Sequence, residues 1–259
     1  MRATPPSTTP PRTLGRPRPA RRRPRRRARS AASAIAAAAV LPLAACAGAA
    51  DEQPAEPAGV TCSYPDSGSP ARPVERPDSL NVPAHGTVPA TLRTSEGAIA
   101  VTLDRSAAPC AVHSLVSLAR QQYFVHTPCH RLTTDPAQVF LLQCGDPTGT
   151  GAGGPGYAVP DEPPAGLAPA PGSADEVMYP RGTVALSNHG VPDSGGSQFF
   201  LVYRDSPLPP SYPVLGRVEP DSLPVLDAIA AHGTDSASSP GDGHPVPPVT
   251  LRAVVLPPQ

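Results

Sequence analysis

The side chains best suited to chemistry lie on three short apolar runs, where polar groups are costly unless they are paired or used. Arg131 lies in residues 129–132, Gln143 lies in residues 140–146, and Gln198 opens residues 198–202 after two glycines. Arginine offers fixed N–H donors to a carbonyl or amide but has no usable proton to give. These residues therefore predict a wall that polarises a peptide group over an apolar slot, and they do not favour acid–base chemistry.

Two glycine-rich stretches invite other interpretations. Residues 149–156 resemble a phosphate-binding loop, but they lack the Gly-Lys-Ser/Thr ending and no helical pattern follows them. Residues 193–196, Asp-Ser-Gly-Gly, resemble the sequence around the nucleophile of trypsin-like proteases, which would make Ser194 the nucleophile. The flanking Pro192 and Ser197 do not fit that family, and its upstream Ala-Ala-His-Cys is absent. We interpret both stretches as close turns.

The elements that must position these residues are many short strands and two helices. Alternating apolar residues predict a hairpin of residues 88–93 and 98–103, and further strands at 129–132, 139–144, 182–188, 198–202, 214–218 and 249–255. Apolar residues at helical spacing predict one helix from Pro109 to about Tyr123 and another over residues 224–231. The pattern predicts a mainly β fold, a single closed barrel with helices covering its ends.

Alternation within the strands also assigns faces. Because successive strand residues point to opposite faces, Gln198 and Phe200 share the face of the slot while Phe199 supports the core. If Arg131 faces the slot, His130 faces away from it and is structural. The seven histidines form no dense cluster of ligands, so we predict no metal site.

The first 45 residues predict an export signal rather than folded protein. Eleven of the 21 arginines lie between Arg2 and Arg29, and an apolar run rich in Ala, Val and Leu extends from about residue 31 to residue 45. A basic region followed by a short apolar run is typical of a secretory signal. The apolar run is shorter than the ~20 residues that span a membrane.

The end of this run, Leu43-Ala-Ala-Cys46, resembles a bacterial lipobox, in which the cysteine is lipidated and becomes the mature N-terminus. We therefore predict a lipoprotein signal peptide in residues 1–45 and a chain anchored through Cys46 to the outer face of the bacterial cell membrane, or secreted if Cys46 is not lipidated. A simple secretory signal and an uncleaved anchor are the alternatives. Residues 46–85, rich in Pro and Ala, predict a flexible linker that Cys62 could fasten to the domain, and residues 86–259 predict the folded domain.

After Cys46 the chain is acidic. It holds 10 Arg against 21 Asp plus Glu, a formal net charge of −11. This balance does not support a basic surface, so we predict no nucleic-acid partner.

Four cysteines remain when Cys46 is set aside: Cys62, Cys110, Cys129 and Cys144. In the oxidising compartment that an export signal implies, four cysteines can pair in three ways, and the sequence does not decide among them. Neighbouring predicted strands favour Cys129 with Cys144, together with Cys62 and Cys110. Four buried thiols are the alternative.

Taken together, the motifs resemble those of the cyclophilin family of peptidyl-prolyl cis/trans isomerases over about residues 86–255. The resemblance rests on Cys129-His-Arg131, Phe140-Leu-Leu-Gln-Cys-Gly-Asp146, Gly151-Ala-Gly-Gly154, Gly182-Thr-Val-Ala-Leu-Ser-Asn188, Gly196-Ser-Gln-Phe-Phe200 and Val214-Leu-Gly-Arg-Val218. It implies a closed eight-stranded antiparallel β-barrel capped by two α-helices, which agrees with the pattern of predicted elements.

The resemblance also implies roles for individual residues. Arg131 would be the catalytic arginine, and Gln143 would order it. The proline pocket and the peptide-binding groups would include Phe140, Leu141, Gly151, Ala152, Asn188, Gln198, Phe200, Leu208 and Tyr212, with Gly151 and Ala152 forming a neighbouring subsite.

The sequence departs from the family pattern around this site. Cys129 and Cys144 stand where the family has Phe and Gly, extra residues precede Phe140, and one extra residue lies between Asn188 and Gln198. These departures predict a reshaped rim around the same groove.

We therefore predict a peptidyl-prolyl cis/trans isomerase that accelerates X–Pro isomerisation in exported proteins and assists their folding at the cell surface. The predicted partners are proline-containing polypeptides and, through Cys46, the membrane. The enzyme is predicted to be a monomer with no cofactor. The alternative is a non-catalytic module on the same fold that binds a proline-containing segment.

Overall fold

The computed structural model describes residues 59–258, and the fold is reported for that part of the chain. The predicted signal of residues 1–45, the lipidation site Cys46 and the first part of the predicted linker lie outside the described residues. Within residues 59–258, neither helix combines the length and the apolar character that crossing a membrane requires.

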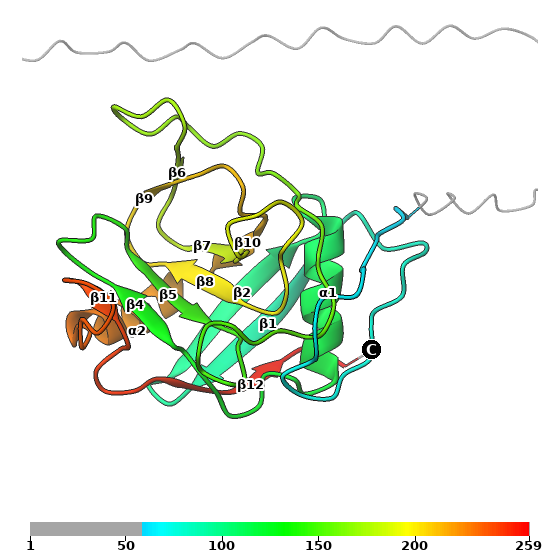
Figure 1. Cartoon of the computed structure of the whole chain (residues 1–259), viewed down its shortest axis with the longest axis horizontal. Coiled ribbons are helices and arrows are strands. Elements are labelled where there is room, and N and C mark those ends of the chain that lie inside the picture. Colours follow the sequence, from blue (N-terminus) through cyan, green and yellow to red (C-terminus); the bar gives the residue numbers. More distant parts are fainter. Residues whose placement is uncertain (1–58, 259) are drawn as a thin grey trace, which may run out of the picture. The chain divides into compact units, whose positions relative to one another are not determined.

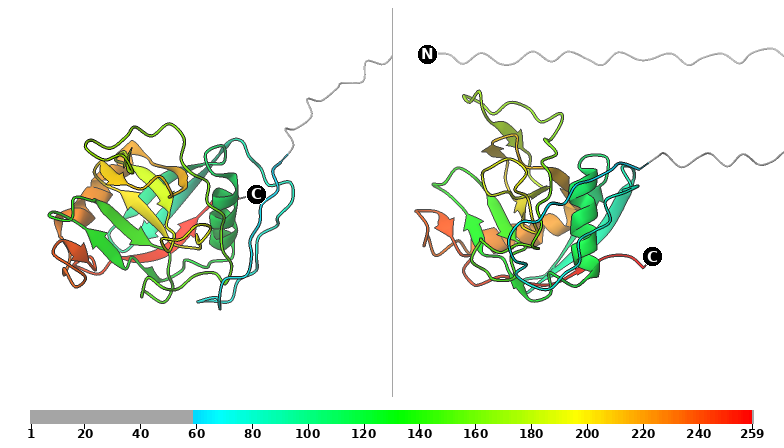
Figure 2. Two further views of the ribbon diagram at one scale, coloured as in Figure 1. Left: turned by 45° about the horizontal axis from the view of Figure 1, so that its top comes forward. Right: turned by 45° about the vertical axis from the view of Figure 1, so that its right-hand side comes forward.

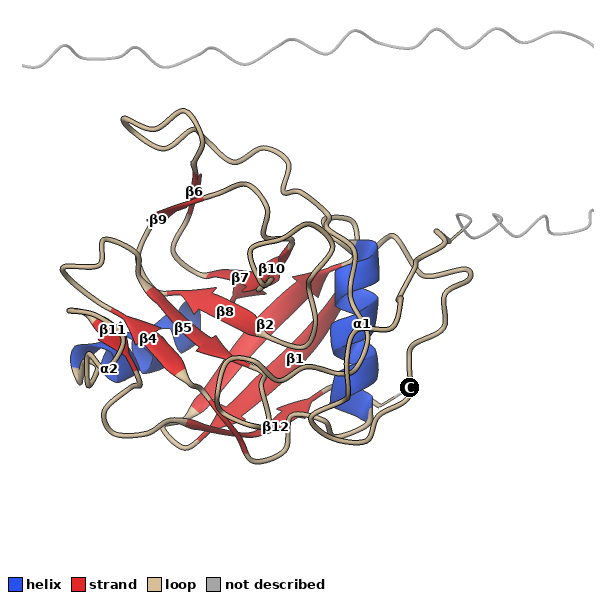
Figure 3. Cartoon of the chain, viewed as in Figure 1, coloured by secondary structure: helices blue, strands red, loops and turns tan. Residues whose placement is uncertain are grey.

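Ten strands form one antiparallel sheet in the order β11-β4-β5-β8-β7-β10-β2-β1-β12-β3 (Figures 1 and 3). Their bounds are β1 (Thr87–Thr94), β2 (Ala98–Asp104), β3 (Thr127–Pro128), β4 (Arg131–Thr133), β5 (Leu141–Cys144), β7 (Thr183–Leu186), β8 (Phe199–Val202), β10 (Val214–Val218), β11 (Asp242–Gly243) and β12 (Thr250–Val255). β1 and β2 form the predicted hairpin, paired from Thr87 with Asp104 to Arg93 with Ala98. The mainly β class is confirmed.

The sheet curls into a half-barrel (Figure 1). In the strand order its outer strands are β11 and β3. Within residues 59–258, no strand pairing joins these two edges, so the expected closed eight-stranded barrel is not shown. The two outer strands have two residues each.

A separate two-stranded sheet, β6 (Val177–Tyr179) with β9 (Ser206–Leu208), lies beside the main sheet (Figure 1). Tyr179 pairs with Ser206 and Val177 pairs with Leu208. Neither strand was predicted from the sequence, because each has three residues within a segment rich in turn-forming residues.

Both predicted helices are present. α1 (Pro109–Arg120) has Pro at its first position, which suits proline because that N–H has no helical partner, and it buries Val112, Leu115 and Leu118. α2 (Leu223–Ala231) follows a 3-10 turn, η1 (Pro220–Ser222), and buries Leu226 and Ile229. The views of Figures 1 and 2 place the two helices toward opposite ends of the curled sheet.

Strand alternation divides the buried residues into two clusters. Leu142, Phe199 and Leu201 belong to the main core, together with apolar residues of α1 and α2. Leu141 and Phe200 belong to a second cluster with Tyr179, Ala185 and Val202. The predicted opposition of Phe199 and Phe200 is therefore confirmed, and the second cluster marks the face that carries the candidate site.

Residues 59–85, called the N-terminal segment below, pack against the rest of the domain (Figures 1 and 2). Tyr64 and Val82 are buried in the main core with 3% and 1% exposure. Val60 and Val82 exchange backbone hydrogen bonds of 2.9 Å. The described part of the predicted flexible linker is thus ordered, because cross-links and backbone pairing supply contacts that its Pro-rich composition does not reveal.

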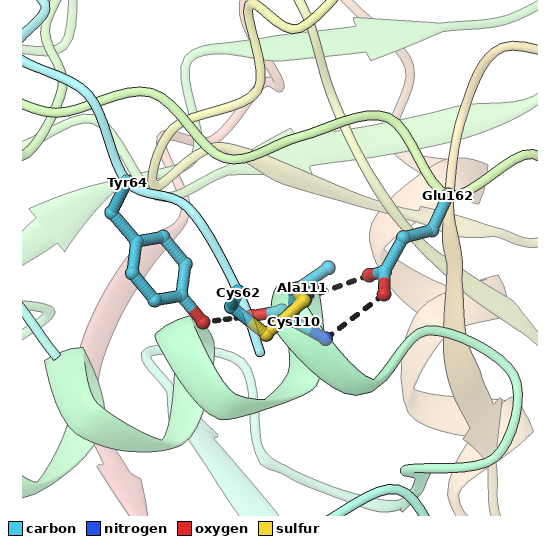
Figure 4. The surroundings of a disulfide bond; sticks show 5 residues. All are labelled: Cys62, Tyr64, Cys110, Ala111 and Glu162. Carbon is cyan, nitrogen blue, oxygen red and sulfur yellow. Dashed lines mark hydrogen bonds between the residues drawn. A yellow bond between two sulfur atoms is a disulfide. The ribbon is translucent and has the colours of Figure 1, made fainter. Parts of the chain in front are cut away.

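Two disulfides, Cys62–Cys110 and Cys129–Cys144, form the pairing that the sequence favoured. Figure 4 shows the first one, which fastens the N-terminal segment to the first turn of α1. The Tyr64 hydroxyl donates to the Cys110 carbonyl at 2.9 Å. The Glu162 carboxylate accepts the N–H groups of Cys110 and Ala111 at 3.0 and 2.8 Å (Figure 4), so it satisfies helix-start donors that would otherwise lack partners.

Candidate active site

A pocket of about 160 Å³ opens beside the second cluster. It is lined by Arg131, Val139, Leu141, Gln143, Ser187, Phe200, Leu208 and Tyr212. Pockets for drug-sized ligands hold about 300–1,000 Å³, so this smaller one suits a single ring or side chain. The structure thus gathers Arg131, Gln143 and four of the apolar or aromatic residues expected from the sequence.

The floor of the pocket is a row of residues paired across four strands. Arg131 of β4 lies opposite Gln143 of β5, Gln143 lies opposite Phe200 of β8, and Phe200 lies opposite Ala185 of β7. Directly opposed residues of antiparallel strands point to the same face. A slip of one residue would turn the apolar side chains of each strand to the wrong face, so the apolar pattern specifies this register.

Asp242 fixes the guanidinium of Arg131. The Nε of Arg131 donates to Oδ1 at 2.8 Å and Nη2 donates to Oδ2 at 2.7 Å, the two-pronged geometry of a strong arginine–carboxylate pair. The Asp242 side chain is 16% exposed, against 43% for Arg131. β11 supplies this carboxylate because it pairs with β4, with Asp242 opposite Thr133.

The ion pair with Asp242 determines the charge of Arg131 and which of its N–H donors remain free. Hydrogen bonding to Asp242 raises the pKa of Arg131 above its ordinary value, so the guanidinium stays charged. Its Nη1 donors make no hydrogen bond within residues 59–258 and remain available for a ligand. Gln143, which was expected to order Arg131, makes no hydrogen bond to it in this structure.

Gln198 connects Gln143 to the glycine-rich loop. The Nε2 of Gln143 donates to Gln198 Oε1 at 2.9 Å and to Ser187 Oγ at 3.2 Å. The Nε2 of Gln198 donates in turn to the carbonyls of Gly151 and Gly153 at 2.8 and 3.0 Å. This chain of amides holds both glutamine side chains in one orientation.

The glycine-rich loop wraps around the buried carboxylate of Asp146. The backbone N–H groups of Thr148, Thr150, Gly151 and Gly153 donate to it at 2.7 to 3.1 Å. A Cβ at Gly153 would overlap this carboxylate. Burial alone would raise the pKa of Asp146, but the hydrogen bonds outweigh it and hold the pKa below its ordinary value. The loop donors serve Asp146, so the phosphate-loop interpretation is not supported.

Aromatic rings form the apolar side of the pocket. Tyr212 and Phe200 meet edge to face with ring centroids 5.3 Å apart, and Tyr179 lies 6.3 Å from each of them. The Tyr179 hydroxyl donates to the carbonyls of Tyr212 and Pro209 at 3.0 and 3.2 Å. Tyr179 therefore fixes the loop that carries Tyr212, and β9 brings Leu208 to the same pocket.

Phe140 is not among the residues around this pocket, so its predicted contact with the proline ring stays a prediction. Its ring packs edge to face on Tyr203 at 5.9 Å, and the guanidinium of Arg204 lies 3.3 Å from its centroid. Cation–π and aromatic contacts of this kind stabilise the Phe140 ring in this position. Val139 takes its place in the lining.

Asn188, Gln198, Gly151 and Ala152 are also absent from this lining, and their peptide-binding roles stay predictions. The Nδ2 of Asn188 donates to the Ser211 carbonyl at 3.1 Å, which ties two loops together. Gly151 offers its carbonyl to Gln198, while Ala152 borders a second pocket.

Two other side chains singled out from the sequence have structural roles. The Ser194 hydroxyl donates to the Val191 carbonyl at 2.6 Å and accepts the His189 N–H at 2.9 Å, and no histidine ring bonds to it in the described chain. It therefore has no base and does not support a protease. A Cβ at Gly151 would lie 3.4 Å from the ring of His130, so His130 packs under the loop rather than in the pocket.

Several site residues were not foreseen. Asp242 lies 111 residues from Arg131, and no motif marks it. Ser187 could have been found from alternation, since it is two residues beyond the buried Ala185 that faces Phe200.

A family model described as "Cyclophilin type peptidyl-prolyl cis-trans isomerase/CLD" matches residues 90–255, which include both helices and every residue that lines the pocket. The chain belongs to the cyclophilin family. The predicted cyclophilin resemblance and the predicted enzyme, a peptidyl-prolyl cis-trans isomerase, are confirmed.

Bacterial cyclophilins are among its relatives. The "Probable peptidyl-prolyl cis-trans isomerase B" of Mycobacterium leprae is 45% identical over 208 residues, which cover 79% of this chain and 69% of that protein. The protein of the same name from Mycobacterium tuberculosis is 44% identical over 79% of this chain and 66% of its own length. The chain thus spans about two thirds of each of these cyclophilins.

Solved cyclophilin structures share the fold. A crystal structure of a cyclophilin-type isomerase from Cryptosporidium parvum has a TM-score of 0.51 and 25% identity, covering 67% of this chain and 99% of that one. A second structure of that protein, in the presence of the dipeptide Ala-Pro, has a TM-score of 0.51 and 24% identity.

Proposed function

We propose that this cyclophilin accelerates X–Pro isomerisation in exported polypeptides and assists their folding. The observation that carries the proposal is the guanidinium of Arg131, held by Asp242 at an apolar pocket the size of one ring. Exported proline-containing polypeptides are the proposed clients.

The proline ring is proposed to occupy the pocket. Leu141, Phe200 and Leu208 offer it an apolar lining, and burial of apolar surface stabilises a complex by about 25 cal/mol per Å². Gln143 is proposed to bind the peptide backbone beside the ring. The structure of the Cryptosporidium parvum cyclophilin in the presence of the dipeptide Ala-Pro supports a proline-containing ligand.

Arg131 is proposed to stabilise the twisted amide. Rotation about an X–Pro bond breaks amide resonance and has a barrier of roughly 20 kcal/mol. In the twisted state the lone pair is localised on the prolyl nitrogen, which becomes a hydrogen-bond acceptor. The free Nη1 donors of Arg131 can bind that nitrogen, whereas the planar amide offers it no lone pair. Such differential binding lowers the barrier without any covalent step.

Export and a lipid anchor at Cys46 are part of the proposal. The basic and apolar residues before Cys46 support it, and so do the two disulfides of the described chain, because disulfides persist in oxidising compartments. A monomer is proposed. The mass of the mature N-terminus tests the anchor: a lipidated Cys46 is expected, and an unmodified or longer N-terminus would contradict it.

We also propose that the half-barrel closes as the eight-stranded barrel of its family. Two residues separate β3 from β4, and the Cys129 N–H between them donates to the Val249 carbonyl at 2.8 Å, next to β12. Amide hydrogen exchange tests closure: protection of Cys129 comparable to that of β5 is expected, and rapid exchange would contradict it.

The isomerase activity is tested with the full chain and a chromogenic proline peptide. We expect a clear acceleration over the spontaneous rate and a loss of about 10²-fold in kcat/KM for Arg131→Ala, because a preorganised donor is worth that much at a developing acceptor. Arg252→Ala, an exposed arginine on β12, is the matched control.

A titration with the same peptide separates the enzyme from the non-catalytic module. Peptide binding without any rate enhancement would favour the module. An Arg131→Ala variant as active as the wild type would refute the proposed role of the arginine.

A further inference from the structure

A second pocket, of about 270 Å³, lies against the glycine-rich loop. Its lining includes Ser67, Ser69, Ala152, Gly154, His189 and Ser194. The chain connects it to the first pocket in two places. His189 is two residues beyond Ser187 of the first pocket, and Gln198 bridges Gln143 of the first pocket to the loop that carries Ala152.

The N-terminal segment forms one wall of this second pocket, although it lies outside the matched cyclophilin region of residues 90–255. Its backbone is paired with the pocket loop. The Ser67 N–H donates to the Gly156 carbonyl at 3.0 Å, the Ala71 N–H donates to Gly154 at 2.8 Å, and the Ala158 N–H donates to Pro65 at 2.9 Å. The wall is therefore fixed on both sides of Ser67-Gly68-Ser69.

Further contacts hold this wall against the domain. The Arg72 guanidinium donates to the carbonyls of Tyr123 and Val125 at 2.7 Å each. The Cys62–Cys110 disulfide fastens the segment five residues before Ser67. A wall tied at both ends can select ligands by shape and hydrogen bonding, because little ordering remains to be done on binding.

The lining of the second pocket offers hydrogen bonds rather than apolar surface. The hydroxyls of Ser67 and Ser69 and the imidazole of His189 make no hydrogen bond within residues 59–258. The Ser194 hydroxyl is already used by the Val191 carbonyl. Three neighbouring groups are thus free to donate or accept.

We infer that the N-terminal segment completes a specificity subsite for a hydrogen-bonding side chain, such as that of Asn, Gln, Ser or Thr, near the proline of the client. The inference rests on the proposed isomerase function. Ser67 and Ser69 supply one wall, His189 supplies the other, and Ala152 leaves room between them. Apolar side chains of the same size leave these polar groups unpaired and are selected against.

The test measures kcat/KM of the full chain on two series of proline peptides, in which each position flanking the proline carries either Gln or Leu. The wild type is expected to prefer Gln at one position. Ser67→Ala/Ser69→Ala is expected to reduce that preference by about three- to tenfold, the worth of one or two hydrogen bonds. Ser69→Trp, which fills the pocket, is expected to abolish it, while glycine-containing peptides keep their rate.

Ser63→Trp is the matched control, since Ser63 is an exposed serine of the same segment that does not line the pocket. An unchanged Gln-to-Leu ratio in both pocket variants would overturn the subsite. An equal loss on all peptides, glycine-containing ones included, would also overturn it, because that indicates general damage. A wild type with no activity on any peptide would refute the proposed function itself and the subsite with it.

Discussion

Asp242 gives Arg131, the proposed catalytic residue of this cyclophilin, a fixed position. Its carboxylate uses Nε and Nη2 of Arg131 and leaves Nη1 for the substrate. Flexible arginine side chains lose rotamer entropy when they are ordered, so a guanidinium that is already held can stabilise the twisted amide at a smaller entropic cost. We therefore expect Asp242 to act as a positioning residue rather than a catalytic one.

Asp242→Asn is expected to lower kcat roughly ten- to hundredfold, since a hydrogen bond to a charged group is worth about 1.5–3 kcal/mol. Because the proline pocket is unchanged, KM is expected to stay within about twofold. Asp242→Glu, which keeps a carboxylate, is expected to recover part of the rate. Steady-state kinetics on one proline peptide measure all three variants, with Asp221→Asn on η1 as the control. A rise in KM at constant kcat would contradict the positioning role.

Sequence motifs identified the pocket residues that lie on paired strands, and they missed the site residues that come from loops. Alternation on neighbouring strands predicted Arg131, Gln143 and Phe200, because the register of the strands sets these residues opposite one another. Asp242 reaches Arg131 from β11, a strand of only two residues in a loop rich in Ser and Gly. Phe140 packs on Tyr203 and lies against the guanidinium of Arg204, contacts that one sequence does not reveal, and its place in the proline pocket stays a prediction.

At the scale of elements, the N-terminal segment shows that a disulfide can hold a Pro-rich stretch of chain against the domain. Its composition predicted a flexible linker, and its buried residues, which include Cys62, Tyr64 and Val82, are too widely spaced to give a periodic signal. The helices and the hairpin, in contrast, carried regular apolar spacing and were predicted within a few residues.

Cys62→Ser/Cys110→Ser is expected to lower the free energy of unfolding by about 2–4 kcal/mol, because the disulfide closes a loop with a sequence separation of 48. Urea unfolding measures the change. Activity on glycine-containing peptides is expected to remain, since this disulfide does not touch the proline pocket. An unchanged unfolding midpoint would show that the segment is held without the cross-link.

Cys129→Ser/Cys144→Ser is expected to act on the rate as well as on stability. Cys129 lies two residues before Arg131, and Cys144 directly follows Gln143. Without the cross-link the two strands can shift at the pocket floor, and we expect kcat to fall roughly tenfold, as for a small misplacement of a catalytic group. Full activity in this variant would mean that the strand ladder alone holds the floor.

At the scale of the whole molecule, stability is expected to fall as the solution becomes mildly acidic. Burial lowers the pKa of His113 and of His130. Below the ordinary histidine value of about 6.5, the unfolded chain therefore takes up protons before the folded chain does, so the free energy of unfolding decreases. Glu162 acts in the opposite direction, because burial raises its pKa.

His113→Asn/His130→Asn is expected to flatten the decrease in unfolding free energy between about pH 7 and pH 5.5, the window just above and below the ordinary histidine pKa. Urea unfolding at a series of pH values measures the slope, with the exposed His232→Asn as the control. A slope equal to that of the wild type would show that other groups govern the acid sensitivity.

Arg131 is proposed to stabilise the twisted amide, and Asp242 is proposed to act only through Arg131. A double-mutant cycle on kcat/KM, with Arg131→Ala, Asp242→Asn and both together, tests this most directly. We expect Asp242→Asn to lower kcat/KM in the wild-type background and to have no further effect once Arg131 is alanine. Equal losses from Asp242→Asn in both backgrounds would contradict it.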